Sequence, residues 1–256
     1  MINVLGYSVI SHNQIFAHNG TKFIQYSGDT SYSDFLSPRE TRRLDALSIN
    51  GLWSTKLLLG NSMYSGAMGE SKTALVTAMK IGTWDATSKL INTAHSSNFV
   101  DLSPMVFPQT VANHLAGIIA IHYKINAYTA AIVERKNGDI KALELAELLL
   151  EDESIDRVLL VIGDSVDENL VKKFKLPFNP DGFISILLGK SDSAIGTINI
   201  QKEKGVSKNA RLSSGNRVTY RLEQLISKMS HSPIGELYIE DLNPESTIKI
   251  SYEVKK

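Results

Sequence analysis

Cysteine is absent from the 256 residues of this chain. Disulfide bonds, cysteine-ligated zinc and thiol nucleophiles are therefore excluded. A net charge is absent as well, because 27 lysine and arginine residues balance 27 aspartate and glutamate residues. A neutral chain gives no overall electrostatic reason to expect nucleic acid or an anionic membrane as a partner.

Long hydrophobic runs are also missing. The longest strongly apolar run, Leu115 to Ile121, is far shorter than the roughly 18 residues that a membrane helix needs. The first residues lack the basic region and the small-residue cleavage site of a secretory signal. We therefore expect a cytoplasmic protein without a membrane span.

Generic catalytic and metal-binding motifs are not found. The sequence has no phosphate-binding loop, no GxGxxG turn after a strand, no HExxH and no GxSxG. On a helix, His114 and His122 would lie about 12 Å apart along the axis, too far to share one metal ion. The sequence thus predicts neither a metal site nor a cofactor.

Apolar segments alternate with segments of helical periodicity along the chain. The central strand segments are continuous apolar runs, which is typical of strands buried on both faces. We expect an α/β fold with a mixed, mostly parallel sheet that helices cover. The predicted strands are 1–11, 73–81, 127–133, 156–163, 182–188 and 194–200, and the predicted helices are 37–59, 83–94, 111–123 and 138–150, with a long loop at 12–36.

Three of these segments carry more specific predictions. Ser37, followed by a proline and then by Glu40, is typical of a capping box that begins a helix. Residues 111–123 are apolar nearly all round, which favours a buried helix. The strand 127–133 is predicted to be buried too.

The character of the sequence changes near Gln201. Residues 201–218 hold five basic side chains and one acidic one, and a helix at 218–229 and strands at 235–239 and 247–254 follow. We therefore divide the chain into residues 1–200 and a short α+β C-terminal extension, 201–256. The basic segment by itself is typical of a solvated linker.

A resemblance to a known family is carried by residues 103–132, SPMVFPQTVANHLAGIIAIHYKINAYTAAI. This stretch resembles the N-terminal half of the β-ketoacyl synthases, the condensing enzymes of the thiolase fold. The matching positions are Ser103, Pro104, Phe107, Pro108, Asn113 and Gly117, and further along Ala142-Leu143, Pro177-Phe178-Asn179 and Asp181-Gly182-Phe183. The resemblance covers residues 1–200 and implies a thiolase-like N-terminal half.

The chain departs from the family at the catalytic position. Ungapped spacing places Lys136, which follows Glu134 and Arg135, where the family has its nucleophilic cysteine. A lysine amine would form an unproductive amide instead of a thioester. The family's two catalytic histidines lie in the second thiolase half, so we expect this chain to carry neither. The resemblance thus implies no catalytic residue.

Within the family, such a subunit is similar to a truncated chain-length factor of type II polyketide or aryl polyene synthases. That role implies a heterodimer with a full-length ketosynthase, whose polyketide, polyene or fatty acyl tunnel the subunit shapes. An acyl carrier protein is a further expected partner, for which the basic segment 201–218 would be a docking site.

The resemblance also implies two contact regions. One is the strand that joins the two subunits of a ketosynthase dimer, with the residues after it: Tyr128, Thr129, Ala131, Ile132, Val133, Glu134, Arg135 and Lys136. The other is a loop that reaches the partner's acyl pocket, with candidates Val106, Phe107, Thr110 and Asn113. Phe107 fits a plain core aromatic equally well, and residues 134–136 fit a solvated turn.

Two other functions remain open at this point. An enzyme could use His114, His122 or Asp164 in a site of its own, for example to hydrolyse acyl-thioesters. Alternatively, the chain could be a purely structural assembly subunit.

Overall fold

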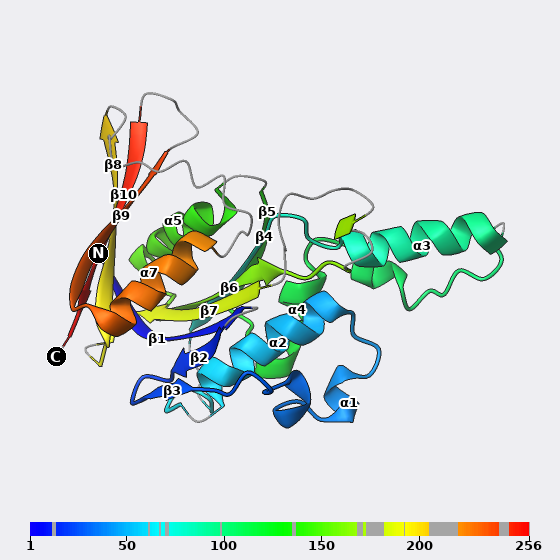
Figure 1. Ribbon diagram of the computed structural model, residues 1–256, viewed down its shortest axis with the longest axis horizontal. Coiled ribbons are helices and arrows are strands. Elements are labelled where there is room, and N and C mark those ends of the chain that lie inside the picture. The colour runs from blue at the N-terminus through cyan, green and yellow to red at the C-terminus, as the bar shows by residue number, and fades with distance from the viewer. Residues whose placement is uncertain are drawn as a thin grey trace.

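The described strands form one 10-stranded sheet with helices on both faces (Figure 1). The computed structural model describes residues 1–11, 14–60, 62–66, 68–69, 72–97, 99–134, 137–167, 171–172, 182–191, 193–204, 220–240 and 246–255. In chain order the elements are β1 (Ile2–Ser11), β2 (Gln14–His18), β3 (Phe23–Gln25), η1 (Tyr32–Asp34), α1 (Pro38–Thr41), α2 (Ala46–Leu59), β4 (Thr73–Met79), α3 (Trp84–Ser97), η2 (Phe107–Thr110), α4 (His114–Tyr123), β5 (Tyr128–Val133), α5 (Gly138–Glu151), β6 (Arg157–Asp164), β7 (Gly182–Gly189), β8 (Gly196–Lys204), α7 (Tyr220–His231), β9 (Ile234–Glu240) and β10 (Ser246–Val254).

Two hydrophobic cores lie on opposite faces of the sheet. Successive residues of a strand point to opposite faces, so Val158 and Leu160 of β6 pack in one core and Leu159 and Val161 pack in the other. Helices α5 and α7 cover the first core, and α2 and α4 cover the second (Figure 1). The predicted α/β fold with helices on both faces is confirmed.

The direction of strand pairing differs from the expected, mostly parallel sheet. The strand order is β5-β4-β6-β7-β1-β8-β10-β9, with β2 and β3 pairing beside β1. Only β5-β4 and β4-β6 are parallel, and the other described pairs are antiparallel. A continuous apolar run indicates that a strand is buried on both faces, but it does not indicate the direction of the strand. An antiparallel strand is buried to the same extent when helices cover both faces of the sheet.

Local corrections concern the first third of the chain. The expected loop at 12–36 contains β2 and β3, and Ile15, Phe16 and Ala17 are buried. The capping box at Ser37 forms, but the helix that it begins ends at Thr41. A second cap, Asp45, begins α2 by accepting a hydrogen bond from the N–H of Ser48.

The segments 111–123 and 127–133 are less buried than expected. On α4 only Leu115, Ala116 and Ile119 are buried, and Ile121 is 79% exposed. The residues at both ends of β5 are exposed. Both elements lie at the β5 end of the sheet, where no further described strand pairs with β5.

The C-terminal residues continue the sheet and the first core. Strand β8 crosses residue 200 and pairs along its length with β10. Leu222, Leu225 and Ile226 of α7 pack in the same core as α5. The division of the chain at residue 200 stays a prediction. None of the described helices is long and apolar enough to cross a bilayer.

Both carboxylate oxygens of Asp164, the last residue of β6, bind the turn that follows β4. Oδ2 accepts a hydrogen bond from the N–H of Lys80 at 2.9 Å, and Oδ1 accepts from the N–H groups of Ile81 at 3.0 Å and Gly82 at 2.9 Å. Gly82 has a φ of +67°, a conformation that favours glycine. Burial raises the pKa of Asp164 from 3.8 to about 6, although the three N–H donors and the Lys80 charge lower it.

Replacing Asp164 with Asn should change how stability depends on pH. Between pH 3.8 and about 6 the folded chain holds a proton at Asp164 that the unfolded chain has released, so the free energy of unfolding falls as the pH rises. A pKa shift of this size corresponds to a decrease in the free energy of unfolding on the order of 3 kcal/mol. Asparagine does not titrate, so D164N lacks this pH dependence. The free energy of unfolding of the wild type minus that of D164N, both measured by urea unfolding, should therefore decrease as the pH rises from 3.8 to about 6. A constant difference would contradict the pKa assignment.

Candidate functional site

Strand β5 forms one edge of the sheet and pairs, among the described strands, only with β4. Tyr128 is 41% exposed and Val133 is 49% exposed. Thr129 is exposed too, while Ala131 and Ile132 are half-buried and pack toward the two cores. The five residues predicted on this strand therefore lie together on an apolar edge whose outer backbone groups face away from β4.

The loop around η2 presents apolar side chains on a fixed backbone. Phe107 is 63% exposed and Met105 is 56% exposed. The hydroxyl of Thr110 donates a hydrogen bond to the carbonyl of Phe107 at 2.7 Å, and the Gln109 side chain donates to the carbonyl of Arg43 at 2.9 Å. The alternative of Phe107 as a core aromatic is thus wrong.

The remaining loop candidates lie beside Phe107. Val106 is half-buried, Thr110 is half-buried, and Asn113 is exposed at the start of α4. Asn113 occupies the cap position of α4 without a side-chain capping bond.

One turn connects the edge strand to this loop. The hydroxyl of Thr83 donates to the carbonyl of Thr110 at 2.8 Å. Gly82 lies beside Val133 of β5. A β-carbon at position 82 would be 3.7 Å from both methyl carbons of Val133, an ordinary van der Waals distance. Residues 80–82 are the ones that Asp164 binds. We call β5 together with residues 105–113 the edge surface.

The charged residues after β5 lie partly outside the described residues. Glu134 forms an ion pair with Lys141 of α5, and its N–H donates to the carbonyl of Met79 at 2.9 Å. Arg135 and Lys136 are outside the described residues, so the placement of Lys136 at the family's cysteine position stays a prediction.

Most of the basic segment, from 205 to 218, also lies outside the described residues. Within the described part, Lys202 forms an ion pair with Glu144 of α5 at 3.0 Å. The expected docking of a carrier protein to this segment stays a prediction.

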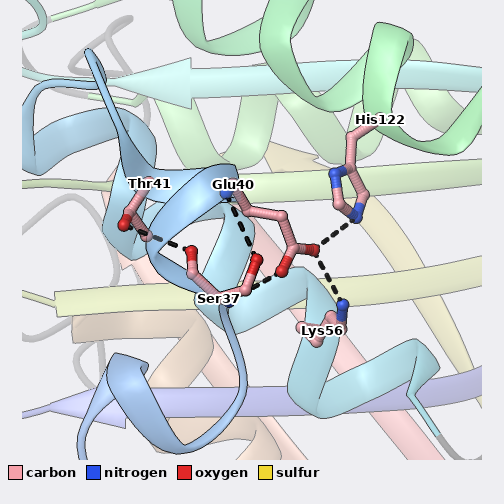
Figure 2. A network of polar contacts seen from close by, with 5 residues as sticks. All are labelled: Ser37, Glu40, Thr41, Lys56 and His122. Atoms are coloured by element: carbon pink, nitrogen blue, oxygen red, sulfur yellow. Dashed lines mark hydrogen bonds and ion pairs between the residues drawn. The ribbon is translucent and has the colours of Figure 1, made fainter.

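His122 belongs to a polar network at the end of α4 (Figure 2). Glu40 Oε1 lies 3.7 Å from Nε2 of His122 and accepts a hydrogen bond from Nζ of Lys56 at 3.1 Å, while Oε2 accepts from the N–H of Ser37 at 2.7 Å. Hydrogen bonding to Ser37, with help from Lys56, lowers the pKa of Glu40 to about 2. Burial and the Lys56 charge lower the pKa of His122, although the Glu40 carboxylate raises it.

The three residues suggested for an independent catalytic site do not form one arrangement. Among the described residues, no hydrogen bond or ion pair joins His114, His122 and Asp164 to one another. Both oxygens of Asp164 already accept backbone N–H groups. Nor does the described part of the chain hold a group of three His, Asp or Glu side chains suited to a metal ion.

Comparisons with known proteins agree with the observed fold. The fold is similar to a chain of the ishigamide ketosynthase/chain length factor, with a TM-score of 0.73 and 10% identity over 100% of this chain and 99% of that chain. It is also similar to the ketosynthase ApeO in complex with its chain length factor ApeC from Xenorhabdus doucetiae, with a TM-score of 0.67 and 13% identity over 98% of each chain.

A third similar structure contains a carrier protein. It is AntDE:AntF, a type II polyketide synthase acyl-carrier protein in complex with its ketosynthase, with a TM-score of 0.76 and 11% identity over 99% of each chain. At these identities the likeness establishes the thiolase-like ketosynthase fold.

Sequence comparison gives the family. No curated protein matches the chain. Residues 55–228, more than half of the chain, match the family described as "Beta-ketoacyl synthase, N-terminal domain". The chain therefore belongs to the β-ketoacyl synthase N-terminal domain family, as residues 103–132 predicted.

Proposed function

We propose that this chain is a non-catalytic subunit of the chain-length-factor type, which pairs with an active ketosynthase through the edge surface and shapes its acyl tunnel. The observation that carries the proposal is an apolar, unprotected edge strand beside an exposed phenylalanine on a fixed loop.

The edge strand lacks the usual protection against pairing. Natural edge strands are blunted by lysine, by proline, by bulges or by a covering element. The six residues Tyr128–Val133 contain no charged residue and no proline, and their register with β4 is regular. A strand from a partner, added to the outer side of β5, would satisfy its backbone groups and cover Tyr128 and Val133.

The absence of cysteine supports a subunit that does not condense acyl chains by itself. In this family the acyl group is held as a thioester on a cysteine, because a thiolate is both a good nucleophile and a good leaving group. This chain has no thiol. In the proposed pair the ketosynthase supplies the nucleophile, as the ketosynthase/chain length factor assignments of two similar structures suggest.

The loop supports a role in shaping the tunnel. Hydrogen bonds from Thr110 and Gln109 fix the backbone around Phe107 before any partner binds, which lowers the entropic cost of association. In the proposed pair, the exposed Phe107 side chain would contact the partner's acyl chain. A carrier protein would deliver that acyl chain to the pair.

Replacing Tyr128 with Asp should prevent assembly. The variant puts a carboxylate without a partner on the edge strand, and burial of such a charge costs several kcal/mol. Titration of an active full-length ketosynthase with each variant, followed by size-exclusion chromatography, should show a dissociation constant raised about 100-fold or more.

Tyr32 is the matched control for this experiment, because it is also 41% exposed and lies in η1. Y32D should assemble like wild type. Equal assembly of Y128D and wild type would refute pairing through β5. A wild-type chain that hydrolyses acyl-thioesters unaided would instead support the enzyme alternative.

Replacing Phe107 with Ala should change the product length of the reconstituted pair, because a large side chain is removed from the proposed tunnel wall. Mass spectrometry of the products should show longer chains for F107A. Phe23, which is 45% exposed on β3, supplies the control variant F23A with unchanged products. An unchanged product distribution for F107A would remove this residue from the tunnel wall.

A further inference from the structure

A cavity of about 460 Å³ lies where the turn between β2 and β3 meets the start of β8 and the end of β10. Tyr7 of β1 and Met229 of α7 complete its walls. The strands β4, β6 and β7 separate β1 from β5 in the sheet, so the cavity lies away from the edge surface. Its volume is in the range of about 300–1,000 Å³ that is typical of pockets for small organic molecules.

Hydrogen bonds hold the walls of this cavity in place. Asn19 is buried, and its Oδ1 accepts hydrogen bonds from the N–H of Thr21 at 3.1 Å and from the Thr21 hydroxyl at 2.8 Å. The carbonyl of Ile195 accepts a hydrogen bond from the N–H of Lys255 at 3.0 Å, which joins the start of β8 to the end of β10. A ligand would therefore enter a cavity that is already formed, which lowers the entropic cost of binding.

His18, the last residue of β2, gives this cavity a hydrogen-bond donor. Its Nδ1 accepts a hydrogen bond from the N–H of Gly20 at 3.3 Å. Because a backbone N–H can only donate, Nδ1 carries no proton and the ring proton lies on Nε2. Burial lowers the pKa of His18, which also favours this neutral ring. The Nε2 atom has no hydrogen-bond partner among the described residues, so its N–H can bind an oxygen atom of a ligand.

The remaining lining residues combine a positive charge with apolar walls. Lys255 brings an ammonium group to the cavity, and the described residues that line it include no acidic side chain. Met229 is buried, and Ile195 and Val254 are half-buried. The cavity thus suits a ligand with an anionic oxygen at one end and a hydrocarbon chain at the other.

We propose that this cavity binds a short-chain carboxylate, with its oxygens on His18 and Lys255 and its hydrocarbon chain against the apolar walls. A carboxylate has two acceptor oxygens, one for each donor. An inorganic anion would leave the apolar walls uncovered, and an uncharged amide would gain no attraction from the Lys255 charge. The inference does not depend on the proposed function.

Binding can be measured on the isolated full chain, with hexanoate as the probe. In calorimetric titrations hexanoate should bind with one-to-one stoichiometry, and in ¹⁵N NMR titrations it should shift the amides of residues 18–22, 193–196 and 254–255. Hexanamide has the same chain without the charge, and acetate has the charge without the chain. Each should bind about 10-fold more weakly than hexanoate or worse.

Three outcomes of these titrations would overturn the proposal. They are no binding of hexanoate, equal affinity for hexanoate and hexanamide, and equal affinity for hexanoate and acetate. Because no ketosynthase is present, none of these outcomes depends on whether the chain pairs with one.

Two variants test the proposed contacts. K255Q and H18F should each weaken the binding of hexanoate about 10-fold or more, because each removes one donor from the carboxylate. Lys22, an exposed lysine of the same turn outside the cavity lining, and His95, an exposed histidine of α3, supply the control variants K22Q and H95F. Both controls should bind hexanoate like the wild type.

Phenylalanine at position 18 keeps a ring beside Tyr7, whose ring centroid lies 5.8 Å from that of His18. Circular dichroism of H18F checks that this variant is folded. The K255Q titration is independent of that check, because the Lys255 side chain is exposed. Wild-type affinity in K255Q, or in folded H18F, would refute the proposed site.

Discussion

The three hydrogen bonds from residues 80–82 to Asp164 are the constraint on which the edge surface depends. They join the end of β6 to the turn after β4, and that turn contacts Val133 on one side and Thr110 on the other. A buried carboxylate is unfavourable unless it is neutralised or hydrogen-bonded. Here three backbone donors satisfy it and thereby fix the path of the turn. Together with α4, which contacts both β5 and η2, this turn supports the edge strand and the loop around Phe107.

The two cores explain why the inner strands of the sheet are covered while the described β5 end is apolar and open. Helices α5 and α7 cover one face and α2 and α4 cover the other, so the inner strands have no exposed face. At the opposite end of the sheet, β9 is preceded by the amphipathic helix α7, which packs back on the first core. At the β5 end, α3 leaves the sheet instead of covering it (Figure 1). Exposed apolar residues therefore gather where the backbone also has unpaired groups, a combination that favours strand addition by a partner.

The sequence allowed the inner strands to be predicted, because a run such as Val158–Ile162 is too apolar for anything but burial on both faces. It did not allow their direction to be predicted, since burial is the same for both directions. Strand β5 has the composition of an inner strand, and only its place in the sheet shows that one side is open. The role of Asp164 could not be assigned from the sequence either, because the backbone groups that it binds lie up to 84 residues away in the chain.

A strand as uniform as Tyr128–Val133 cannot by itself choose between a ketosynthase and a second copy of this chain, because backbone pairing carries little information about the partner. Specificity is a difference between two affinities, and the features beside the strand have to supply it. The side chains that could supply it are the exposed Phe107 on the adjacent loop and Glu134 at the end of the strand, because a partner must fit both of them while it pairs with β5.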